Sequence, residues 1–476
     1  MDKALKEITP KSEDFSQWYT DVVKKADLMD YAPVKGFIVI RPYAYRIWEF
    51  IQADLDVRFR ATGHENAYFP LLIPESLLTR EAEHVEGFSP EVAWVTIGGG
   101  EVLSERLAVR PTSETIVGAM YARWIQSYRD LPVLINQWNS VVRWEKSTRP
   151  FLRTTEFLWQ EGHTVHRTED EAVREAEQQL EAYRGLMQEV LAIPAVAGIK
   201  SAGERFAGAV ETYTLEALMS DGRALQAATS HFLGQNFSKA FDIQFLDEDG
   251  GLKYGWTTSW GASTRLLGAL IMVHGDDRGL RLPPRVAPIQ VVIVPIGKGG
   301  ERAQIVEYCH ALKKRLDPST RVMVDDRDEF TPGYKFNDWE MRGVPLRLEV
   351  GPRDVAAGQV MASRRDGGAK FAIAASELER AVSVVLDEIQ HSLYEQALAN
   401  LNAGSVEITD YQEALARDRR GFFYGDWCGE EACAAHLQEE TSMTIRCLPL
   451  GLSPAWTGCA VCHQPSRHRV VFARAY

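Results

Sequence analysis

Long apolar runs are missing from the sequence. No segment approaches the roughly 20 apolar residues needed to cross a bilayer, and the chain is polar from Asp2 onward. We therefore expect a cytoplasmic protein with no membrane partner. An excess of basic residues is also missing, since 53 Lys and Arg stand against 66 Asp and Glu, a net charge of -13. This balance argues against a coat of basic patches for non-specific nucleic-acid binding, although a specific RNA contact depends only on the charge along the contact surface.

Cysteine is scarce until the end of the chain. Of the six cysteines, only Cys309 precedes residue 428, and in a cytosolic chain such clustering favours a metal site over disulfides. Two short cysteine pairs have the spacing of a closed, tetrahedral and therefore structural zinc site, whereas Cys309 and Cys447 are expected to be ordinary buried residues. The alternative is four unbound thiols. The candidate ligands are Cys428, Cys433, Cys459 and Cys462.

The chain of 476 residues is too long for a single hydrophobic core, and its prolines at 283, 284 and 288 mark a boundary. Residues 1–285 predict an antiparallel sheet flanked by helices. Residues 286–400 alternate strand and helix, which predicts a compact α/β domain. Residues 401–476 form a small cysteine-bearing α+β unit, which we expect to have little apolar core of its own. The fold class is therefore α+β.

Periodicity locates individual elements within these domains. A helix is expected over 12–29 with Phe15 and Trp18 on its buried face, and a buried strand over 67–73 that carries Pro70. Thr168 and Glu171 predict a capping box at the start of a helix that stops before residue 194. Further helices are expected over 46–60, up to 316, 335–341 and 375–398, and further strands over 289–296, 321–324 and 345–350.

The segment 141–163 (VVRWEKSTRPFLRTTEFLWQEGH) predicts a hairpin, because two strand-like runs flank a polar loop. Strand alternation is expected to place Arg143 and Glu145 on one face, and Phe157, Trp159 and Glu161 on one face of the return strand. An arginine here can bind a phosphate through two hydrogen bonds, and Phe157 offers a flat surface for adenine. The alternative is a surface hairpin with solvated arginines.

Two further segments favour a nucleotide site. Residues 260–265 (WGASTR) lead into an apolar helix through Val273, and a helix start with free N–H groups suits a polyphosphate. Thr112 and Glu114 form a Thr-x-Glu pair, which by itself is as typical of a helix cap as of a site.

Taken together, these segments resemble the class II prolyl-tRNA synthetases. The hairpin 141–163 is similar to the second motif of class II synthetases, 260–265 to the third, and the segment around Pro70 to the first, which makes a dimer contact in that family. Residues 110–115, 157–163 and 226–231 resemble the prolyl enzymes in particular. Only a hundred residues separate Glu161 from Gly261, so the resemblance is to the archaeal/eukaryotic-type form without the editing insertion.

The resemblance implies ATP-dependent activation of proline and its transfer to tRNA(Pro) by a cytoplasmic homodimer. It implies ATP and Mg²⁺ at the active site and a structural Zn²⁺ in the tail. Arg143 and Arg265 are the expected catalytic residues. The residues expected to bind proline are Thr112, Glu114, Arg143, Trp159, Glu161, His163 and His231. Those expected to bind ATP are Arg143, Glu145, Arg153, Thr154, Phe157, Gln226, Thr229, Ser263 and Arg265, with Gln226 and Thr229 near magnesium.

The second domain resembles the family's anticodon-binding domain in residues 331–340 and 347–353. Between residues 321 and 370 nine basic residues stand against nine acidic ones, so the sequence predicts no basic patch there. Splayed bases need stacking faces and polar groups that read their edges. The candidates for the anticodon are Phe336, Glu340, Arg347 and Lys370.

Two other functions are open to such a sequence. A catalytically idle paralogue is expected to have lost Arg143, Arg265 or Thr112, and all three are present. An enzyme that adenylates a carrier other than tRNA is disfavoured by the domain that resembles an anticodon-reading module.

Overall fold

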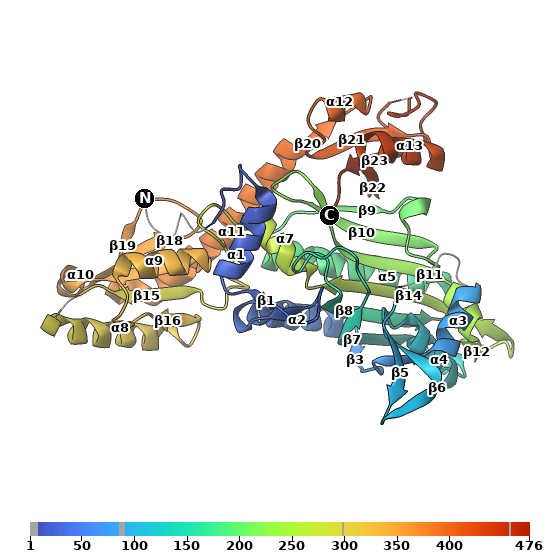
Figure 1. The fold of residues 1–476 in the computed structure, drawn as a ribbon, viewed down its shortest axis with the longest axis horizontal. Helices are drawn as coiled ribbons and strands as arrows, with labels where there is room; N and C mark the ends of the chain where they lie inside the picture. The colour runs from blue at the N-terminus through green and yellow to red at the C-terminus, as the bar shows by residue number, and fades with distance from the viewer. Residues whose placement is uncertain (1–7, 85–90, 298, 457) are drawn as a thin grey trace.

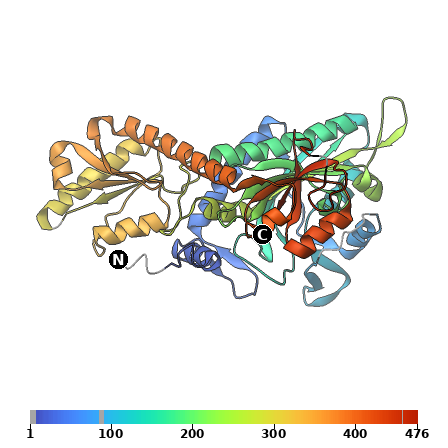
Figure 2. The same cartoon turned by 90° about the horizontal axis from the view of Figure 1, so that it is seen from above.

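The computed structural model describes residues 8–84, 91–297, 299–456 and 458–476. In Figure 1 a large sheet with its covering helices lies on the right and an α/β domain on the left, with the C-terminal segment above the large sheet. Figure 2 shows the long helix α11 (Leu378–Gly404, orange) running from the α/β domain to the core. None of the helices in these ranges is long and apolar enough to cross a membrane.

The large sheet has eleven strands in the order β20-β21-β23-β22-β9-β10-β11-β14-β8-β7-β3. Its central strands pair antiparallel, which confirms the predicted antiparallel sheet and the hairpin formed by β7 and β8. The strands nearest the site are β7 (Val133–Val142), β8 (Glu156–His166), β9 (Val196–Ile199), β10 (Glu211–Leu218), β11 (Ala224–Gly234) and β14 (Trp256–Ser263), and β3 (Glu65–Asn66) lies at the edge.

Helices pack on this sheet as their apolar faces require. Thr168 caps α5 (Glu169–Gly185) by accepting a hydrogen bond from the backbone N–H of Glu171, which confirms the capping box. The chain continues as a π-helical turn over Leu186–Val190. Three more helices cover the core: α1 (Phe15–Lys25), α2 (Pro42–Ala61) and α7 (Arg265–His274). Helix α1 buries Trp18 as predicted, together with Tyr19, Val22 and Val23, whereas Phe15 is half-buried.

The expected buried strand over 67–73 is wrong. Only Leu72–Pro74 form a strand, β4, whereas Tyr68 and Leu71 are exposed. Pro70 has no N–H to donate to a ladder, so the chain runs here without regular structure. Strand β4 pairs instead in a small separate sheet, whose order is β4-β6-β5. Its partners are β5 (Trp94–Gly98) and β6 (Glu101–Val109). Helix α3 (Glu75–His84) packs on this sheet, and α4 (Glu114–Trp124) packs on α3.

The α/β domain is built on a five-stranded sheet of order β16-β15-β17-β18-β19. Val291 and Ile293 point to a core shared with α8, and Val292 and Val294 to one shared with α9, so these helices cover opposite faces. The predicted strands are β15 (Val291–Pro295), β16 (Val322–Val324) and β17 (Leu346–Val350), with helices α8 (Arg302–Leu316), α9 (Pro332–Met341) and α11. The elements not predicted are α10 (Pro352–Ala357) and the antiparallel pair β18 (Gln359–Arg364) and β19 (Phe371–Ala374).

The C-terminal segment differs from expectation because it has a core of its own. Phe423, Trp427, Leu437 and Phe472 are buried there, together with Cys428 and Cys459. The segment also extends the large sheet, since β22 pairs with β9. Its elements are β20 (Ser405–Glu407), α12 (Gln412–Leu415), β21 (Phe422–Trp427), α13 (Glu431–Thr441), β22 (Thr444–Pro449) and β23 (His468–Ala473).

Besides single turns of 3-10 helix, the described chain contains two more hairpins and one more short α-helix. The hairpins are β1 (Met29–Tyr31) with β2 (Ile38–Ile40), and β12 (Gln244–Leu246) with β13 (Leu252–Tyr254). Helix α6 (Asn236–Phe241) follows β11.

Candidate active site

A cavity opens over strands β8, β11 and β14 at the start of α4. Its floor comes from the strands, and one wall comes from a loop that precedes β10. Polar and aromatic side chains surround it. They include Thr112, Glu114, Arg143, Phe157, Trp159, Glu161, His163, Glu204, Arg205, Phe206, Gln226, Thr229, His231, Ser263 and Arg265.

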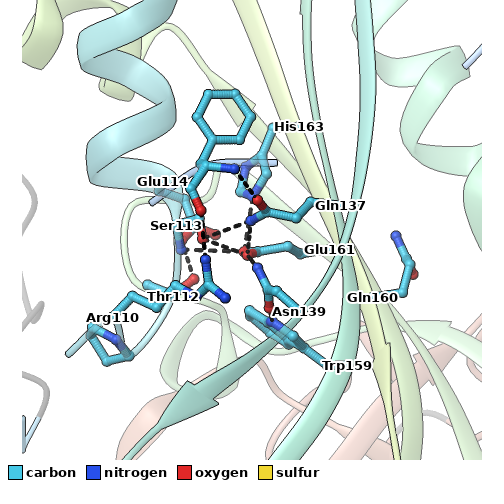
Figure 3. Close-up of polar contacts among 12 residues, drawn as sticks. Arg110, Thr112, Ser113, Glu114, Gln137, Asn139, Trp159, Gln160, Glu161 and His163 are labelled. Atoms are coloured by element: carbon cyan, nitrogen blue, oxygen red, sulfur yellow. Dashed lines mark hydrogen bonds and ion pairs between the residues drawn. The ribbon is translucent and has the colours of Figure 1, made fainter. Parts of the chain in front are cut away.

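A buried carboxylate, that of Glu161 on β8, organises one end of the cavity (Figure 3). Its Oε1 accepts hydrogen bonds from Ser113 Oγ (2.5 Å), Gln137 Nε2 (3.0 Å) and Asn139 Nδ2 (2.6 Å). Its Oε2 accepts one from the backbone N–H of Ser113 (3.2 Å) and lies 3.0 Å from His163 Nε2. Five hydrogen bonds from the N-cap of α4, from β7 and from β8 thus satisfy the charge, as a buried carboxylate requires.

Glu161 and His163 form a charged pair in this environment. Burial opposes the charge on Glu161, but the hydrogen bond and charge of His163 and the hydrogen bonds from Ser113 and Asn139 outweigh it and lower its pKa. Burial likewise opposes the charge on His163, and the hydrogen bond and charge of Glu161 outweigh it and raise the pKa of the histidine. The pair is therefore held in its ionised form.

A second carboxylate, Glu114, faces the cavity. Glu114 lies in the first turn of α4 and accepts a short hydrogen bond from the Thr112 hydroxyl. Thr112 therefore binds the carboxylate and does not cap the helix, because the cap position belongs to Ser113. The structure therefore does not fit the alternative in which the Thr-x-Glu pair serves only as a helix cap.

Two arginines bring positive charge to the same cavity. Arg143 donates from Nε to the carbonyl oxygen of Pro111 (3.0 Å), and its guanidinium lies 5.4 Å from the ring centre of Phe157 and 5.5 Å from that of Trp159. Arg265, the first residue of α7, donates weakly to the Leu152 carbonyl oxygen (3.3 Å). Burial, with a smaller contribution from the charge of Arg143, lowers the pKa of Arg265 to about 10. Two like charges that line one cavity are typical of an anion site.

His231 on β11 is held neutral. Its Nδ1 lies 3.0 Å from Thr212 Oγ1 and its Nε2 lies 3.1 Å from Thr229 Oγ1, so both ring nitrogens have hydroxyl partners. Burial, with a smaller contribution from the charge of His163, lowers its pKa to about 3. The ring stacks on Phe206, with 4.6 Å between ring centres. It offers the cavity an uncharged aromatic wall.

The structure brings most of the sequence-predicted residues together. All seven candidates for proline and six of the nine for ATP line the cavity. Glu145 and Arg153, 2.9 Å apart in an ion pair, line a neighbouring hollow that shares Arg143 with the cavity. Thr154 lines neither hollow, and its hydroxyl donates to the Glu156 carbonyl oxygen (2.6 Å).

One geometric expectation is wrong. Arg143 and Glu145 lie beyond the last residue of β7, Val142, so strand alternation does not determine which way their side chains point.

Other residues of the site were not predicted. Gln137 and Asn139 alternate along β7 and could have been found from that pattern, whereas the loop residues Glu204, Arg205 and Phe206 carry no motif. Their part in the wall follows only from the tertiary structure.

The four anticodon candidates lie together, on one side of the α/β domain. The Arg347 guanidinium lies 4.1 Å from the ring centre of Phe336 and pairs with Glu340 (2.9 Å) and Glu349 (3.1 Å). Lys370 pairs with the same Glu349 (2.6 Å). Both cations among the four candidates thus have an acidic partner.

The four candidate metal ligands also converge. The Sγ atoms of Cys428, Cys433, Cys459 and Cys462 all lie within 4.8 Å of one another. Cys428 Sγ is 3.5 Å from Cys433 Sγ and 3.8 Å from Cys462 Sγ. Four thiolates at zinc–sulfur distances of about 2.3 Å lie about 3.8 Å apart in a tetrahedron, so the cluster could hold such an ion. Cys309 and Cys447 are buried elsewhere, as predicted.

Three family models match the chain in sequence order. The tRNA synthetase class II core domain (G, H, P, S and T) matches residues 100–274, which contain the cavity's principal residues. An anticodon binding domain matches residues 290–384, and the C-terminal domain of prolyl-tRNA synthetase matches residues 408–476.

Curated relatives match along at least 98% of their length. The proline--tRNA ligase of Alkaliphilus oremlandii (strain OhILAs) is 56% identical over 474 residues, which cover 99% of this chain and 98% of the relative. That of Rubrobacter xylanophilus is 54% identical over 479 residues and covers 100% of both chains. Proline--tRNA ligase 2 of Clostridioides difficile (strain 630) is 56% identical over 475 residues, 99% of this chain and 98% of the relative.

The paired charges of Glu161 and His163 predict a pH-dependent stability. Because the pKa of His163 is raised in the folded state, its contribution is fully present below its unfolded value of 6.5 and is lost as the pH rises through the folded value. His163→Gln keeps a hydrogen-bond donor but does not titrate. We expect the difference in thermal midpoint between wild type and this variant to be largest near pH 6 and to shrink toward pH 9. Differential scanning fluorimetry across this range measures it, and a constant difference would contradict the pairing.

Proposed function

This chain belongs to the proline--tRNA ligases, which are class II aminoacyl-tRNA synthetases, and we propose that its cavity carries out both steps of the reaction with the residues described above. In the first step ATP activates proline, giving prolyl-adenylate and pyrophosphate. In the second step proline is transferred to the 3′-end of tRNA(Pro), and AMP is released. Proline, ATP and tRNA(Pro) are its substrates.

The observation that carries the assignment is the pairing of opposite charges in one cavity. Glu114 supplies negative charge for the ammonium group of proline, while Arg143 and Arg265 supply positive charge for its carboxylate and for the phosphates of ATP. A zwitterion bound between them directs its carboxylate toward the α-phosphate. Such positioning is the main contribution a protein makes when no covalent intermediate is needed.

For proline we assign distinct roles to the two carboxylates. The secondary ammonium of proline offers two N–H donors, and Glu114, with Thr112 beside it, is placed to accept them. Glu161 already accepts from five partners, so we assign it, with His163, to hold the pocket in shape. The rings of Trp159 and His231 provide walls for the pyrrolidine ring.

For ATP the two arginines have the principal role. Arg143, held beneath Phe157 and Trp159, faces the α-phosphate and stabilises charge as proline's carboxylate attacks phosphorus and pyrophosphate leaves. Arg265 at the start of α7, beside Ser263, neutralises the phosphates. Phe157 stacks on adenine. Glu145, Arg153 and Thr154 lie outside the cavity, and we assign the first two to ATP from the neighbouring hollow.

The magnesium that we propose with ATP fits neutral oxygen donors. Gln226 and Thr229 line the cavity and offer such oxygens, and Mg²⁺ characteristically takes most of its other ligands from phosphates and water. When bound, the ion neutralises phosphate charge.

In the second step the terminal ribose hydroxyl of the tRNA attacks the carbonyl carbon of the adenylate, and the AMP phosphate leaves.

We propose that the enzyme has the archaeal/eukaryotic-type form without an editing insertion. Between Glu161 and Gly261 the chain forms α5, β9, β10, β11 and α6, which belong to the large sheet or pack on it. The hairpin β12–β13 and two single helical turns, Leu186–Val190 and Ala202–Glu204, are the remaining elements of this segment in the described chain. We assign the domains as residues 1–285, 286–400 and 401–476, for catalysis, anticodon binding and zinc binding.

For the tail we propose one structural Zn²⁺ bound by the four cysteines. Four thiolates leave no open position for a substrate, so the ion would stabilise the fold around α13. The backbone N–H of Val461 donates to Cys459 Sγ (3.4 Å), which favours the thiolate form that zinc requires.

For tRNA we propose that Phe336, Glu340, Arg347 and Lys370 read the anticodon. The face they share presents one aromatic ring and polar groups of both signs.

We further propose that the protein is cytoplasmic, because a protein that charges tRNA works where tRNA is used, and that it forms a homodimer. The exposed Tyr68 and Leu71 beside Pro70 and the exposed Tyr31 and Val39 of the β1–β2 hairpin are available for the subunit contact.

Arg143→Ala tests the active-site assignment. Removing a transition-state contact of this kind typically lowers the rate about 10²- to 10³-fold, so proline-dependent ATP–pyrophosphate exchange should nearly disappear while the thermal midpoint changes little. Arg123→Ala, an exposed arginine on α4, is the matched control and should exchange normally. Exchange by Arg143→Ala within a few-fold of wild type would remove the residue from the mechanism.

Glu340→Ala tests the anticodon assignment. Arg347 keeps its second partner, Glu349, so the fold should persist, and tRNA charging should fall while proline-dependent exchange is unchanged. Glu307→Ala on α8, which covers the opposite face of the domain's sheet, is the acidic control and should charge normally. An equal loss of both activities in Glu340→Ala would place the residue in the fold or the active site instead.

Cys459→Ser tests the metal assignment. Loss of one of four ligands should lower zinc content and thermal midpoint, whereas Cys309→Ala, in the core of the α/β domain, should leave zinc content unchanged. Metal analysis of purified protein and a melt with and without chelator are the measurements. Less than about half a zinc per wild-type chain, with a melting point unmoved by chelator, would contradict the site.

A further inference from the structure

One wall of the amino-acid pocket is a loop that belongs to none of the synthetase motifs. The loop, residues 201–206, contributes Glu204, Arg205 and Phe206 to the cavity. The Phe206 backbone N–H donates to Thr212 Oγ1 (3.1 Å), the hydroxyl that also bonds His231, and the Phe206 ring stacks on the His231 ring. Where the loop lies therefore decides how His231 is covered.

The loop has few contacts to hold it in that position. It is mostly exposed and forms one turn of 3-10 helix, over Ala202–Glu204. Short, exposed segments with few buried contacts open at low free-energy cost. Within the catalytic domain the Arg205 Nη1 donates to the Val210 carbonyl oxygen (2.6 Å), and further contacts reach the outer side of the loop at Gly203 and Glu204.

The C-terminal domain supplies that contact at two points. Glu431, at the start of α13, accepts a hydrogen bond from the backbone N–H of Gly203 (3.2 Å). Arg446 on β22 reaches Glu204, with 3.9 Å between Nη1 and Oε2. Both partners lie on the loop itself, more than two hundred residues earlier in the chain.

Arg446 is itself firmly placed. It is buried, and its Nε donates to Glu216 Oε2 (3.1 Å), while Lys200, the residue directly before the loop, pairs with Glu216 Oε1 (2.7 Å). Buried charges that are paired in this way do not move without leaving one of them unpaired, which is costly. Arg446 thus joins the base of the loop, at Lys200, to its tip, at Glu204.

We propose that Glu431 and Arg446 of the C-terminal domain are positioning residues for the amino-acid pocket: they hold the loop 201–206 against His231 and thereby set the affinity for proline. The inference rests on the assignment of this cavity to proline. Neither residue touches the substrate, so the effect is on the fraction of molecules whose pocket is closed. Apparent affinity falls in proportion to that fraction.

The proposal predicts a division between kinetic constants. A loop that is closed less often raises the KM for proline, but saturating proline restores the closed state and hence kcat. The phosphate-binding arginines lie on α7 and beyond β7, outside the loop, so the KM for ATP should stay unchanged.

Three variants of α13 test it by ATP–pyrophosphate exchange. Glu431→Ala removes one charged, exposed hydrogen bond and should raise the KM for proline about fivefold. Glu431→Gln keeps an oxygen that accepts from Gly203 N–H and should restore most of the affinity. Glu439→Ala, an exposed acid further along α13, is the control and should match wild type.

Two more measurements separate positioning from a general loss of stability. Trypsin should cleave after Arg205 faster in Glu431→Ala than in wild type at an unchanged thermal midpoint, and proline with a non-hydrolysable ATP analogue should slow this cleavage. Arg446→Lys, which keeps the charge beside Glu216 but shortens the reach to Glu204, should also raise the KM for proline. An unchanged KM for proline in both variants, or a KM for ATP that rises equally, would overturn the proposal. Absence of proline-dependent exchange in wild type would instead contradict the assignment of the cavity.

Discussion

The buried carboxylate of Glu161 is the constraint on which the amino-acid pocket depends. A negative charge in the interior must be satisfied by donors, and here five hydrogen bonds come from Ser113, Gln137, Asn139 and His163. These donors lie on three segments, so satisfying one group fixes the start of α4 against β7 and β8. Thr112 and Glu114 flank Ser113 and take their places in the cavity because of it.

The ligand that each site suits depends on which of its charged side chains have a partner within the protein and which do not. In the pocket, Glu161 is paired internally, whereas Glu114 and the two arginines face the cavity with capacity for a substrate. Among the anticodon candidates, both cations, Arg347 and Lys370, already have an acidic partner. The first arrangement suits a zwitterion and a polyphosphate, and the second suits reading of base edges, where polar groups count more than net charge.

The C-terminal domain has its own core, but it also extends the sheet that carries the cavity. Pairing of β22 with β9 continues the ladder, and the buried trio of Lys200, Glu216 and Arg446 joins the two behind the pocket wall. The last residue, Tyr476, donates to Asp221 (2.5 Å) and lies beneath Arg149. A tail fixed at so many points is suited to influence a pocket that it does not enter.

Local chemistry let the sequence determine much of this protein: the hairpin, the cap at Thr168, the α/β elements and the cysteine pairs all follow from periodicity, capping or ligand spacing. Two predictions from the sequence were wrong. Residues 67–73 have the apolar composition of a strand, but Pro70 has no N–H to donate to a neighbouring strand. Arg143 lies beyond the end of the strand that was expected to orient its side chain. The antiparallel strands β18 and β19, the core of the tail and the loop 201–206 were decided by tertiary structure alone. Each depends on contacts with residues far away in the chain. Such contacts stabilise the segment without giving its own sequence a periodic pattern of apolar residues.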